Sequence, residues 1–277
     1  MLNIVVCIKQ VPMVTELPWD EKSATLRRDL AAGMMNPACK HAVEAALQMK
    51  EKHGAVVTVL TMGPPVAEEV LREALAMGVD GGLLISDRLL AGSDTYATSF
   101  ILAEAVRKAC PQFDLILCGA YTSDSETAQV GPQMAEELNL PAAAYAENLE
   151  INGRTLRVRR LVDNFRETLE MEFPALVTVS MEKYSPRYAS FRGLEEAFSD
   201  RDIFVFNAQD LGITPENLAG HGSRTKVRKV FIRKAQKQNV MITGAAASAA
   251  GEFLDRYQGM ISAAIGKSIE SKKKAVE

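Results

Sequence analysis

The stretch DLILCGAYTSDSETAQVGPQMAE, residues 114–136, combines the patterns of a buried strand, a polar turn and a helix start. A continuous apolar run at 115–118 ends at Gly119, small polar and acidic residues fill 122–126, and apolar residues then recur at helical spacing from Val130. The first N–H groups of a helix lack partners within the helix and favour an anion, most often a phosphate. The pattern fits a phosphate-binding turn and also an ordinary strand–turn–helix unit.

The same order of strand, turn and helix occurs three times before this stretch. Continuous apolar runs at 4–8, 56–60 and 83–85 are typical of strands buried on both faces. The helices predicted after them begin at Asn36-Pro37, at Val66 and at Ser93 or Asp94. Alternating strands and helices predict an α/β fold with a doubly wound parallel sheet and right-handed crossovers. Ligands of such sheets bind beyond the carboxyl ends of the strands, where the strand order reverses.

The pattern changes after Pro141. Asn152-Gly153 between two β-prone runs predicts a hairpin, and further strand-like runs follow at 168–173 and 175–179. We expect antiparallel strands to extend the sheet. The predicted division is a nucleotide-binding domain over residues 1–200 and a C-terminal arm and helix over residues 201–277.

Composition and charge exclude several classes of function. The formal net charge of -3 does not favour a nucleic-acid partner, and no apolar stretch is long enough to span a bilayer, so the chain is expected to be cytoplasmic. The four cysteines lack CxxC spacing and the three histidines lie apart, so no metal site is predicted. No serine–histidine–aspartate set is apparent, so no side chain is predicted to be catalytic.

Several motifs, in order, resemble the β subunits of electron-transfer flavoproteins. They are VVCIKQVP at 5–12, NPAC at 36–39, REALAMGVD at 72–80, DLILCGAYTSDSETAQVGPQMAEELNLP at 114–141 and VRRLVDNFRETLEMEFPALVTVS at 158–180. The resemblance implies an adenine-nucleotide-binding α/β fold and an obligate heterodimer with an FAD-carrying α subunit. It extends over most of residues 1 to about 235.

Members of this family that only relay electrons hold AMP in the β subunit, whereas members that bifurcate electrons hold a second FAD there. The stretch SDRLLAGSDTYATS, residues 86–99, looks like the bifurcating form; taken alone, its end is also an ordinary capped helix start. The resemblance therefore implies that FAD in this chain takes a hydride from NADH. One electron would pass through the α-subunit FAD to an acyl-CoA dehydrogenase, and the other to ferredoxin or flavodoxin.

By the same resemblance, three groups of residues would contact the cofactor. The adenosine group comprises Cys7, Asn36, Cys39, Met62 and Gly63. The pyrophosphate group comprises Asp124, Thr127, Ala128, Gln129, Val130 and Gly131. The ribityl and ring group comprises Gly92, Ser93, Asp94, Thr95 and Thr98. No lysine or arginine occurs between residues 109 and 153, so N–H groups and hydroxyls are expected to hold the anion.

Two residues are expected at partner surfaces. Phe191 matches an exposed apolar anchor that enters the partner dehydrogenase, although an aromatic residue under a loop can equally belong to the core. Glu167 matches an acid near the α-subunit flavin. Two alternatives to bifurcation remain: a single-flavin relay subunit with structural AMP, and a stand-alone ATP-binding regulatory domain. The strands and arm beyond residue 145 argue against the second alternative.

Overall fold

The computed structural model describes residues 1–13, 19–20, 25–26, 32–163, 165–199, 201–214, 216, 222–225 and 240–274. The chain forms two units, Met1–Lys229 and Val230–Glu277, each of which is compact by itself. Residues 226–239 of the predicted C-terminal arm lie outside the described residues.

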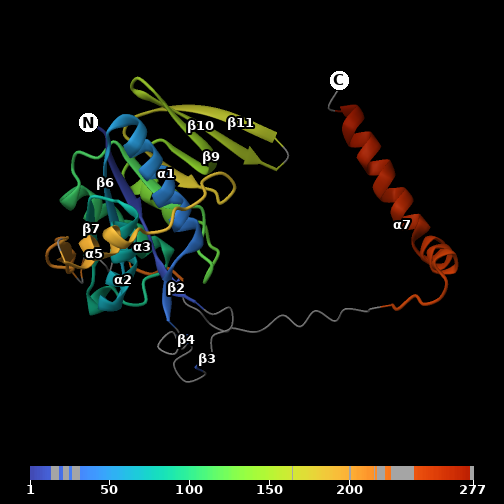
Figure 1. The fold of residues 1–277 in the computed structure, drawn as a ribbon, viewed down its shortest axis with the longest axis horizontal. Helices are drawn as coiled ribbons and strands as arrows, with labels where there is room; N and C mark the ends of the chain where they lie inside the picture. Colours follow the sequence, from blue (N-terminus) through green and yellow to red (C-terminus); the bar gives the residue numbers. More distant parts are fainter. Residues whose placement is uncertain are drawn as a thin grey trace. The chain divides into compact units, whose positions relative to one another are not determined.

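One large sheet forms the centre of the first unit (Figure 1). Its strands are β1 (Asn3–Cys7), β6 (Val56–Met62), β7 (Gly81–Ile85), β8 (Leu115–Gly119), β9 (Ala142–Asn152), β10 (Thr155–Val162), β11 (Phe165–Glu172), β12 (Ala175–Val179) and β13 (Ile203–Phe206). Their order across the sheet is β11-β10-β9-β12-β8-β1-β6-β7-β13. The chain moves from β1 through β6 to β7 on one side and then returns to place β8 on the other side of β1. This reversal confirms the predicted doubly wound sheet.

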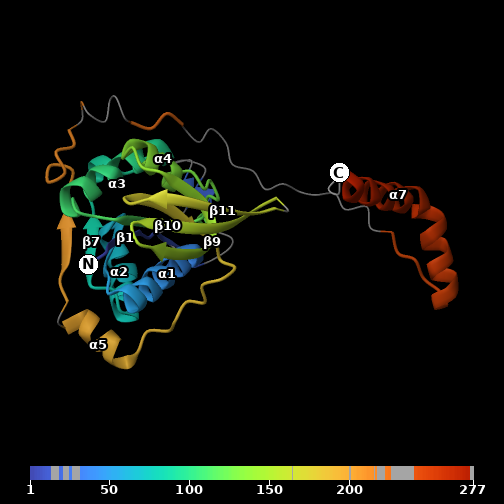
Figure 2. The same cartoon turned by 90° about the horizontal axis from the view of Figure 1, so that it is seen from above.

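Helices cover both faces of the sheet. They are α1 (Pro37–His53), α2 (Glu68–Met77), α3 (Thr95–Ala109) and α4 (Val130–Glu137), with short 3₁₀ turns η2 (Pro65–Ala67) and η3 (Arg88–Leu90). Leu47 of α1 and Leu75 of α2 belong to one apolar core, and Ile101 of α3 and Met134 of α4 belong to a second core on the opposite face. Figure 2 shows the sheet between these two helical layers.

The antiparallel extension is confirmed for β9, β10 and β11, but β12 differs from the prediction. β10 is antiparallel to both β9 and β11, whereas β12 runs parallel to β8 and to the first half of β9. All five residues of β12 are buried, as in a strand covered on both faces. Tyr145, at φ 60°, lies where β9 changes from pairing with β12 to pairing with β10.

Beyond residue 190 the chain contributes two further elements to the first unit. α5 (Phe191–Ser199) follows β12, and β13 pairs in parallel with β7 at the edge of the sheet. Because β13 belongs to the sheet, the boundary expected at residue 200 falls within the first unit. Two short antiparallel pairs, β2 (Gln10–Pro12) with β5 (Gly33–Met35) and β3 (Trp19–Asp20) with β4 (Thr25–Leu26), lie between β1 and α1 in the sequence.

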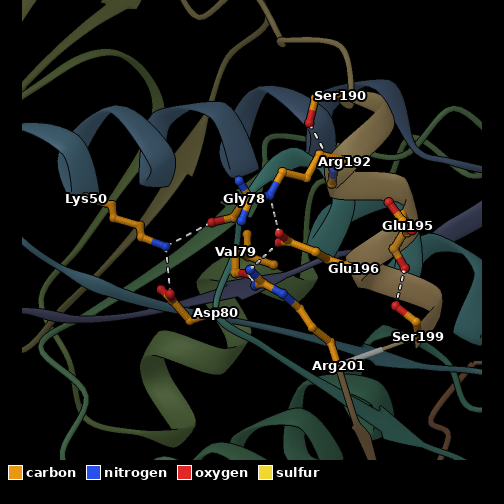
Figure 3. Close-up of polar contacts among 11 residues, drawn as sticks. Lys50, Gly78, Val79, Asp80, Ser190, Arg192, Glu195, Glu196, Ser199 and Arg201 are labelled. Atoms are coloured by element: carbon orange, nitrogen blue, oxygen red, sulfur yellow. Dashed lines mark hydrogen bonds and ion pairs between the residues drawn. The ribbon is translucent and has the colours of Figure 1, made fainter.

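Polar contacts hold α5 against the turn between α2 and β7 (Figure 3). Arg201 donates to the Val79 carbonyl at 2.5 Å and lies 3.6 Å from the Glu196 carboxylate, which also accepts from Arg192 at 2.6 Å. Lys50 donates to the carbonyl of Gly78 in the same turn at 2.9 Å. The backbone carbonyls that end α2 therefore anchor both α1 and the segment after α5.

The second unit contains α7 (Ala246–Lys274), which lies within the C-terminal region predicted to contain a helix. Exposed apolar side chains occur along it, and the rings of Phe253 and Tyr257 lie 5.1 Å apart between centroids. No helix of the described residues is both long and apolar enough to cross a membrane.

Candidate nucleotide-binding site

The candidate site lies at the carboxyl edge of the sheet, where β1 and β8 are neighbours. Cys7 at the end of β1 is in register with Cys118 of β8. Lys9 follows β1, and the turn at 120–129 follows β8, so both leave the sheet at this edge. The strand order reverses here, which makes this edge the expected ligand position of a doubly wound sheet.

The turn after β8 presents backbone donors. Glu126 and Ala128 have φ angles of 51° and 54°, a left-handed conformation that is uncommon outside glycine and that clusters at binding sites. The helix α4 begins directly afterwards at Val130 without a side-chain cap. Among the described residues, no hydrogen bond uses the backbone N–H groups of residues 127–131. This arrangement of free donors at a helix N-terminus is suited to a phosphate.

Gly131 is required for packing within the protein. A Cβ atom at this position would lie 2.6 Å from Cγ2 of Thr178 on β12, so only glycine lets α4 approach this strand. Gly119 has a similar role at the end of β8, where a Cβ would lie 2.7 Å from the backbone of Cys39 in α1. Close packing thus accounts for both glycines, and the contact of Gly131 with a ligand stays a prediction.

Asn36 joins the start of α1 to the turn after β8. Pro37 occupies the first helical position as predicted, but the Asn36 side chain does not cap the helix. Its Nδ2 donates to the Tyr121 carbonyl at 2.8 Å, and its Oδ1 accepts from the Ser123 N–H at 3.0 Å. Asn36 is 1% exposed, so both atoms of its amide position the turn. Its predicted contact with adenosine remains untested.

Lys9 is a site residue that the sequence pattern did not reveal. Its Nζ lies 2.9 Å from both carboxylate oxygens of Asp124, whose side chain is 5% exposed. The absence of lysine and arginine between 109 and 153 suggested a site without cations. The fold brings in Lys9 from 115 residues away. The available signal was its position directly after the first buried strand, because that place lies at the carboxyl edge.

Three cysteine thiols lie beneath the surface at this edge of the sheet. Cys7, Cys39 and Cys118 are all buried. The adjacent Cys118 thiol and burial both raise the pKa of Cys7, and burial raises the pKa of Cys39 despite a hydrogen bond from Asn36. Cys7 and Cys39 are therefore neutral near physiological pH, and they contribute apolar surface rather than a nucleophile.

The β7–α3 loop lies beside the turn after β8. Gly92 has a φ of 78°, which the bend before α3 requires. Asp94 is the N-cap of α3, and its Oδ1 accepts from the Ala97 N–H at 3.0 Å. Thr95 donates from Oγ1 to Oε1 of Gln129 at 2.8 Å. This bond joins the predicted ring-binding loop to the predicted pyrophosphate-binding turn.

The remaining predicted residues occupy the same edge. Gly63 follows β6, and its N–H donates to the Ile85 carbonyl at the end of β7. Met62 packs partly into the core under α3 and α4. Ser93 donates from Oγ to the Leu90 carbonyl at 2.7 Å. The fold thus places the predicted cofactor residues at strand ends, turns and helix starts along one edge of the sheet. Their contacts with a ligand stay predictions. No group of three or more metal-ligating side chains occurs within the described ranges.

Phe191 and Glu167 lie away from this edge. Phe191 is 95% exposed at the start of α5, which excludes a core role for its ring. The segment before it is held by Arg187, which contacts Glu44 and Glu51 of α1. Glu167 of β11 pairs with Arg160 of β10 at 2.8 Å. The partner contacts of both residues stay predictions.

The sheet order, the switch point and the donor-rich turn define an α/β protein of the nucleotide-binding class. Residues 23–200 match the family model described as the electron transfer flavoprotein domain. The chain is 39% identical over 255 residues to "Electron transfer flavoprotein subunit beta" of Thermoanaerobacterium thermosaccharolyticum, covering 92% of this chain and 97% of the relative.

Two further relatives have names that include a partner enzyme. "Caffeyl-CoA reductase-Etf complex subunit CarD" of Acetobacterium woodii is 40% identical, covering 88% of this chain and 92% of the relative. "Acryloyl-CoA reductase electron transfer subunit gamma" of Anaerotignum propionicum is 36% identical, covering 92% and 97%. The chain belongs to the electron transfer flavoprotein β-subunit family, and its role is in electron transfer.

Proposed function

We propose that this chain is the β subunit of an electron-bifurcating electron transfer flavoprotein, with FAD at the carboxyl edge of its sheet. When bound, FAD would take a hydride from NADH and pass the two electrons to separate acceptors. These acceptors are an acyl-CoA dehydrogenase, reached through the FAD of an α subunit, and ferredoxin or flavodoxin. No side chain of this chain acts as a general acid or base in this proposal, because the cofactor carries the chemistry.

The hydrogen bond between Thr95 and Gln129 is the main observation that favours FAD over AMP in this proposal. It joins the β7–α3 loop to the phosphate-suited turn, which supports a single ligand that contacts both segments. AMP would contact the turn after β8 and the neutral thiols of Cys7 and Cys39, but it has no group beyond its single phosphate. A dinucleotide extends further, toward the hydroxyls of the β7–α3 loop.

The residues at this edge fit the parts of FAD. The free N–H groups at 127–131 suit the pyrophosphate, because hydrogen bonds to a dispersed negative charge do not require cations. Lys9 offsets the charge of Asp124, which would otherwise repel the phosphates. The neutral thiols of Cys7 and Cys39 suit contact with the face of the adenine ring. The hydroxyl of Thr98, on the first turn of α3, is suited to the ribityl chain.

Partner binding is assigned to surfaces outside this edge. Exposed Tyr188 and Phe191 lie before and at the start of α5, and we assign them to the partner dehydrogenase. The relatives named as subunits of acyl-CoA reductase systems favour a dehydrogenase that acts on an acyl-CoA. The exposed apolar residues of α7, among them Phe253 and Met260, are assigned to the α subunit. Glu167 is assigned to the approach of the α-subunit flavin.

The alternative is a relay subunit that holds structural AMP. It is tested by releasing the nucleotides from the purified heterodimer and quantifying FAD and AMP. Two FAD per heterodimer without AMP, together with NADH-driven reduction of ferredoxin, supports bifurcation. One FAD and one AMP contradicts it and leaves the relay role.

A further inference from the structure

The segment Ser223–Thr225 contacts the β7–α3 loop from about 130 residues further along the chain. The N–H groups of Arg224 and Thr225 donate to Oδ2 of Asp94 at 2.7 and 2.8 Å. The Thr225 hydroxyl donates to the same oxygen at 2.9 Å. In the other direction, the Asp94 N–H donates to Oγ of Ser223 at 2.8 Å. The segment thus binds both the backbone and the carboxylate of the residue that caps α3.

These contacts occupy the Asp94 carboxylate. An ionised carboxylate has about four lone-pair positions for hydrogen bonds. Oδ1 accepts from the Ala97 N–H, and Oδ2 accepts three bonds from Arg224 and Thr225. Oδ2 is therefore fully occupied, whereas Oδ1 keeps one acceptor position beside the Ala97 N–H. Most of the hydrogen bonds of Asp94 thus hold the loop, which suits this side chain to a positioning role.

The same segment contacts two neighbours of Asp94. Oγ of Ser223 lies 3.4 Å from the carbonyl of Gly92, the left-handed residue of the loop. The Arg224 guanidinium carbon lies 5.6 Å from the ring centroid of Tyr96 on the first turn of α3, within the range of a cation–π contact. The backbone of the loop and the start of α3 are both tied to this segment.

We propose that Ser223, Arg224 and Thr225 are positioning residues of the nucleotide site, and that they act by holding Asp94. The proposal rests on the proposed FAD site, because it gives the β7–α3 loop a role in cofactor binding. The segment fixes the loop in the arrangement in which Thr95 bonds Gln129. A loop that is already ordered loses less conformational entropy when FAD binds, so the segment tightens binding without touching the cofactor.

The test compares Thr225→Val with wild type in the full-length heterodimer. Valine has the shape of threonine but lacks the hydroxyl that donates to Asp94. Thr155→Val is the matched control, because its hydroxyl also makes one 2.9 Å bond, to Asn152 in the remote β9–β10 turn. Thr225→Ser restores the donor. For each variant, dissociation constants of FAD and of AMP are measured on nucleotide-depleted protein, and hydrogen exchange is followed over residues 86–99.

We expect Thr225→Val to weaken FAD binding by about tenfold, equivalent to about 1.4 kcal/mol. It should also speed exchange in the loop, whereas Thr155→Val changes neither measurement and Thr225→Ser recovers both. Unchanged exchange and FAD affinity within twofold of wild type would overturn the proposal. Faster exchange with unchanged affinity would overturn it as well, because the segment would then shape the loop without serving the site.

Failure of the proposed FAD site is separable from failure of this inference. If wild-type protein binds AMP tightly and FAD hardly at all, the bifurcating function fails. In that case a weaker affinity of Thr225→Val for AMP, together with faster loop exchange, still supports the positioning role. An unchanged affinity for AMP overturns it.

Discussion

The guanidinium of Arg187 binds the carboxylate of Glu44 through two bonds, from Nε to Oε2 at 2.8 Å and from Nη2 to Oε1 at 3.0 Å. Only 5% of the Glu44 side chain is exposed, and Gln48 supplies a further donor at 2.9 Å. The pair fixes the segment after β12 on α1. It thereby sets where the chain emerges to present the exposed rings of Tyr188 and Phe191.

Arg187→Met is expected to destabilise the protein by about 2–4 kcal/mol, because it leaves a buried carboxylate without its main partner. Urea unfolding measures this loss. Arg157→Met is the control, since Arg157 and its partner Glu170 are both more than half exposed and their pair should contribute less than about 1 kcal/mol. Adding Glu44→Gln to Arg187→Met should recover part of the stability. Equal effects of the Arg187 and Arg157 variants would contradict the importance of this pair.

The Glu44 pair should make stability depend on pH in the acid range. Burial alone would raise the pKa of Glu44, but hydrogen bonds from Arg187 and Gln48 outweigh it and lower the pKa below its ordinary value of 4.5. A lowered folded pKa means that the stabilisation is complete above 4.5 and is lost as pH falls through the folded value. The difference in unfolding free energy between wild type and Glu44→Gln should therefore be constant at neutral pH and shrink in acid. A difference independent of pH would show that the charge of Glu44 is unimportant.

Gly131→Ala should destabilise the protein by about 1–3 kcal/mol, because its new methyl group overlaps Cγ2 of Thr178. Thr178→Ser removes that methyl group and keeps the hydroxyl that accepts from the Tyr145 N–H. The double variant should then be more stable than Gly131→Ala alone, as measured by thermal unfolding. If the double variant is no more stable than Gly131→Ala, glycine is needed at this position for its backbone conformation and not to avoid the contact with Thr178.

Lys9→Met should weaken binding of the nucleotide by about tenfold, equivalent to about 1.4 kcal/mol. The reason is that Lys9 supplies a positive charge that offsets the Asp124 carboxylate beside the proposed phosphate position. Isothermal titration of nucleotide-depleted protein measures the change. Lys9→Met combined with Asp124→Asn removes both charges and should restore much of the affinity. Equal affinity of wild type and Lys9→Met would place the phosphates away from this pair.

Phe191→Ala should leave stability within about 0.5 kcal/mol of wild type, because the residue is 95% exposed. It should raise the concentration of partner dehydrogenase needed for half-maximal electron transfer by about tenfold or more, as expected for an aromatic anchor in an interface. Phe204→Ala, at another exposed phenylalanine on β13, is the control and should leave this concentration unchanged. An unchanged requirement in Phe191→Ala would remove Phe191 from the interface.

The sequence predicted the helices and strands that are set by local pattern. Continuous apolar runs marked β1, β6 and β8, Asn36-Pro37 marked the start of α1, and Asn152-Gly153 marked the β9–β10 turn. The signals lie within a few residues of the elements they define, because buried strands need unbroken apolar runs and tight turns need particular backbone angles. The alternation of strands and helices was then enough to predict the doubly wound sheet and its ligand edge.

The sequence did not predict features that depend on contacts between distant segments. The parallel position of β12, the addition of β13 to the sheet, and the side-chain contacts of Asn36 with the turn after β8 are of this kind. The ion pair of Lys9 with Asp124 and the hydrogen bond from Thr225 to Asp94 also depend on distant segments. No local sequence pattern predicts these contacts, because the two partners of each are far apart in the sequence and meet only in the folded chain. The sequence alone determined the fold class and the family resemblance and predicted the ligand edge, and the tertiary structure decided which side chains meet at that edge.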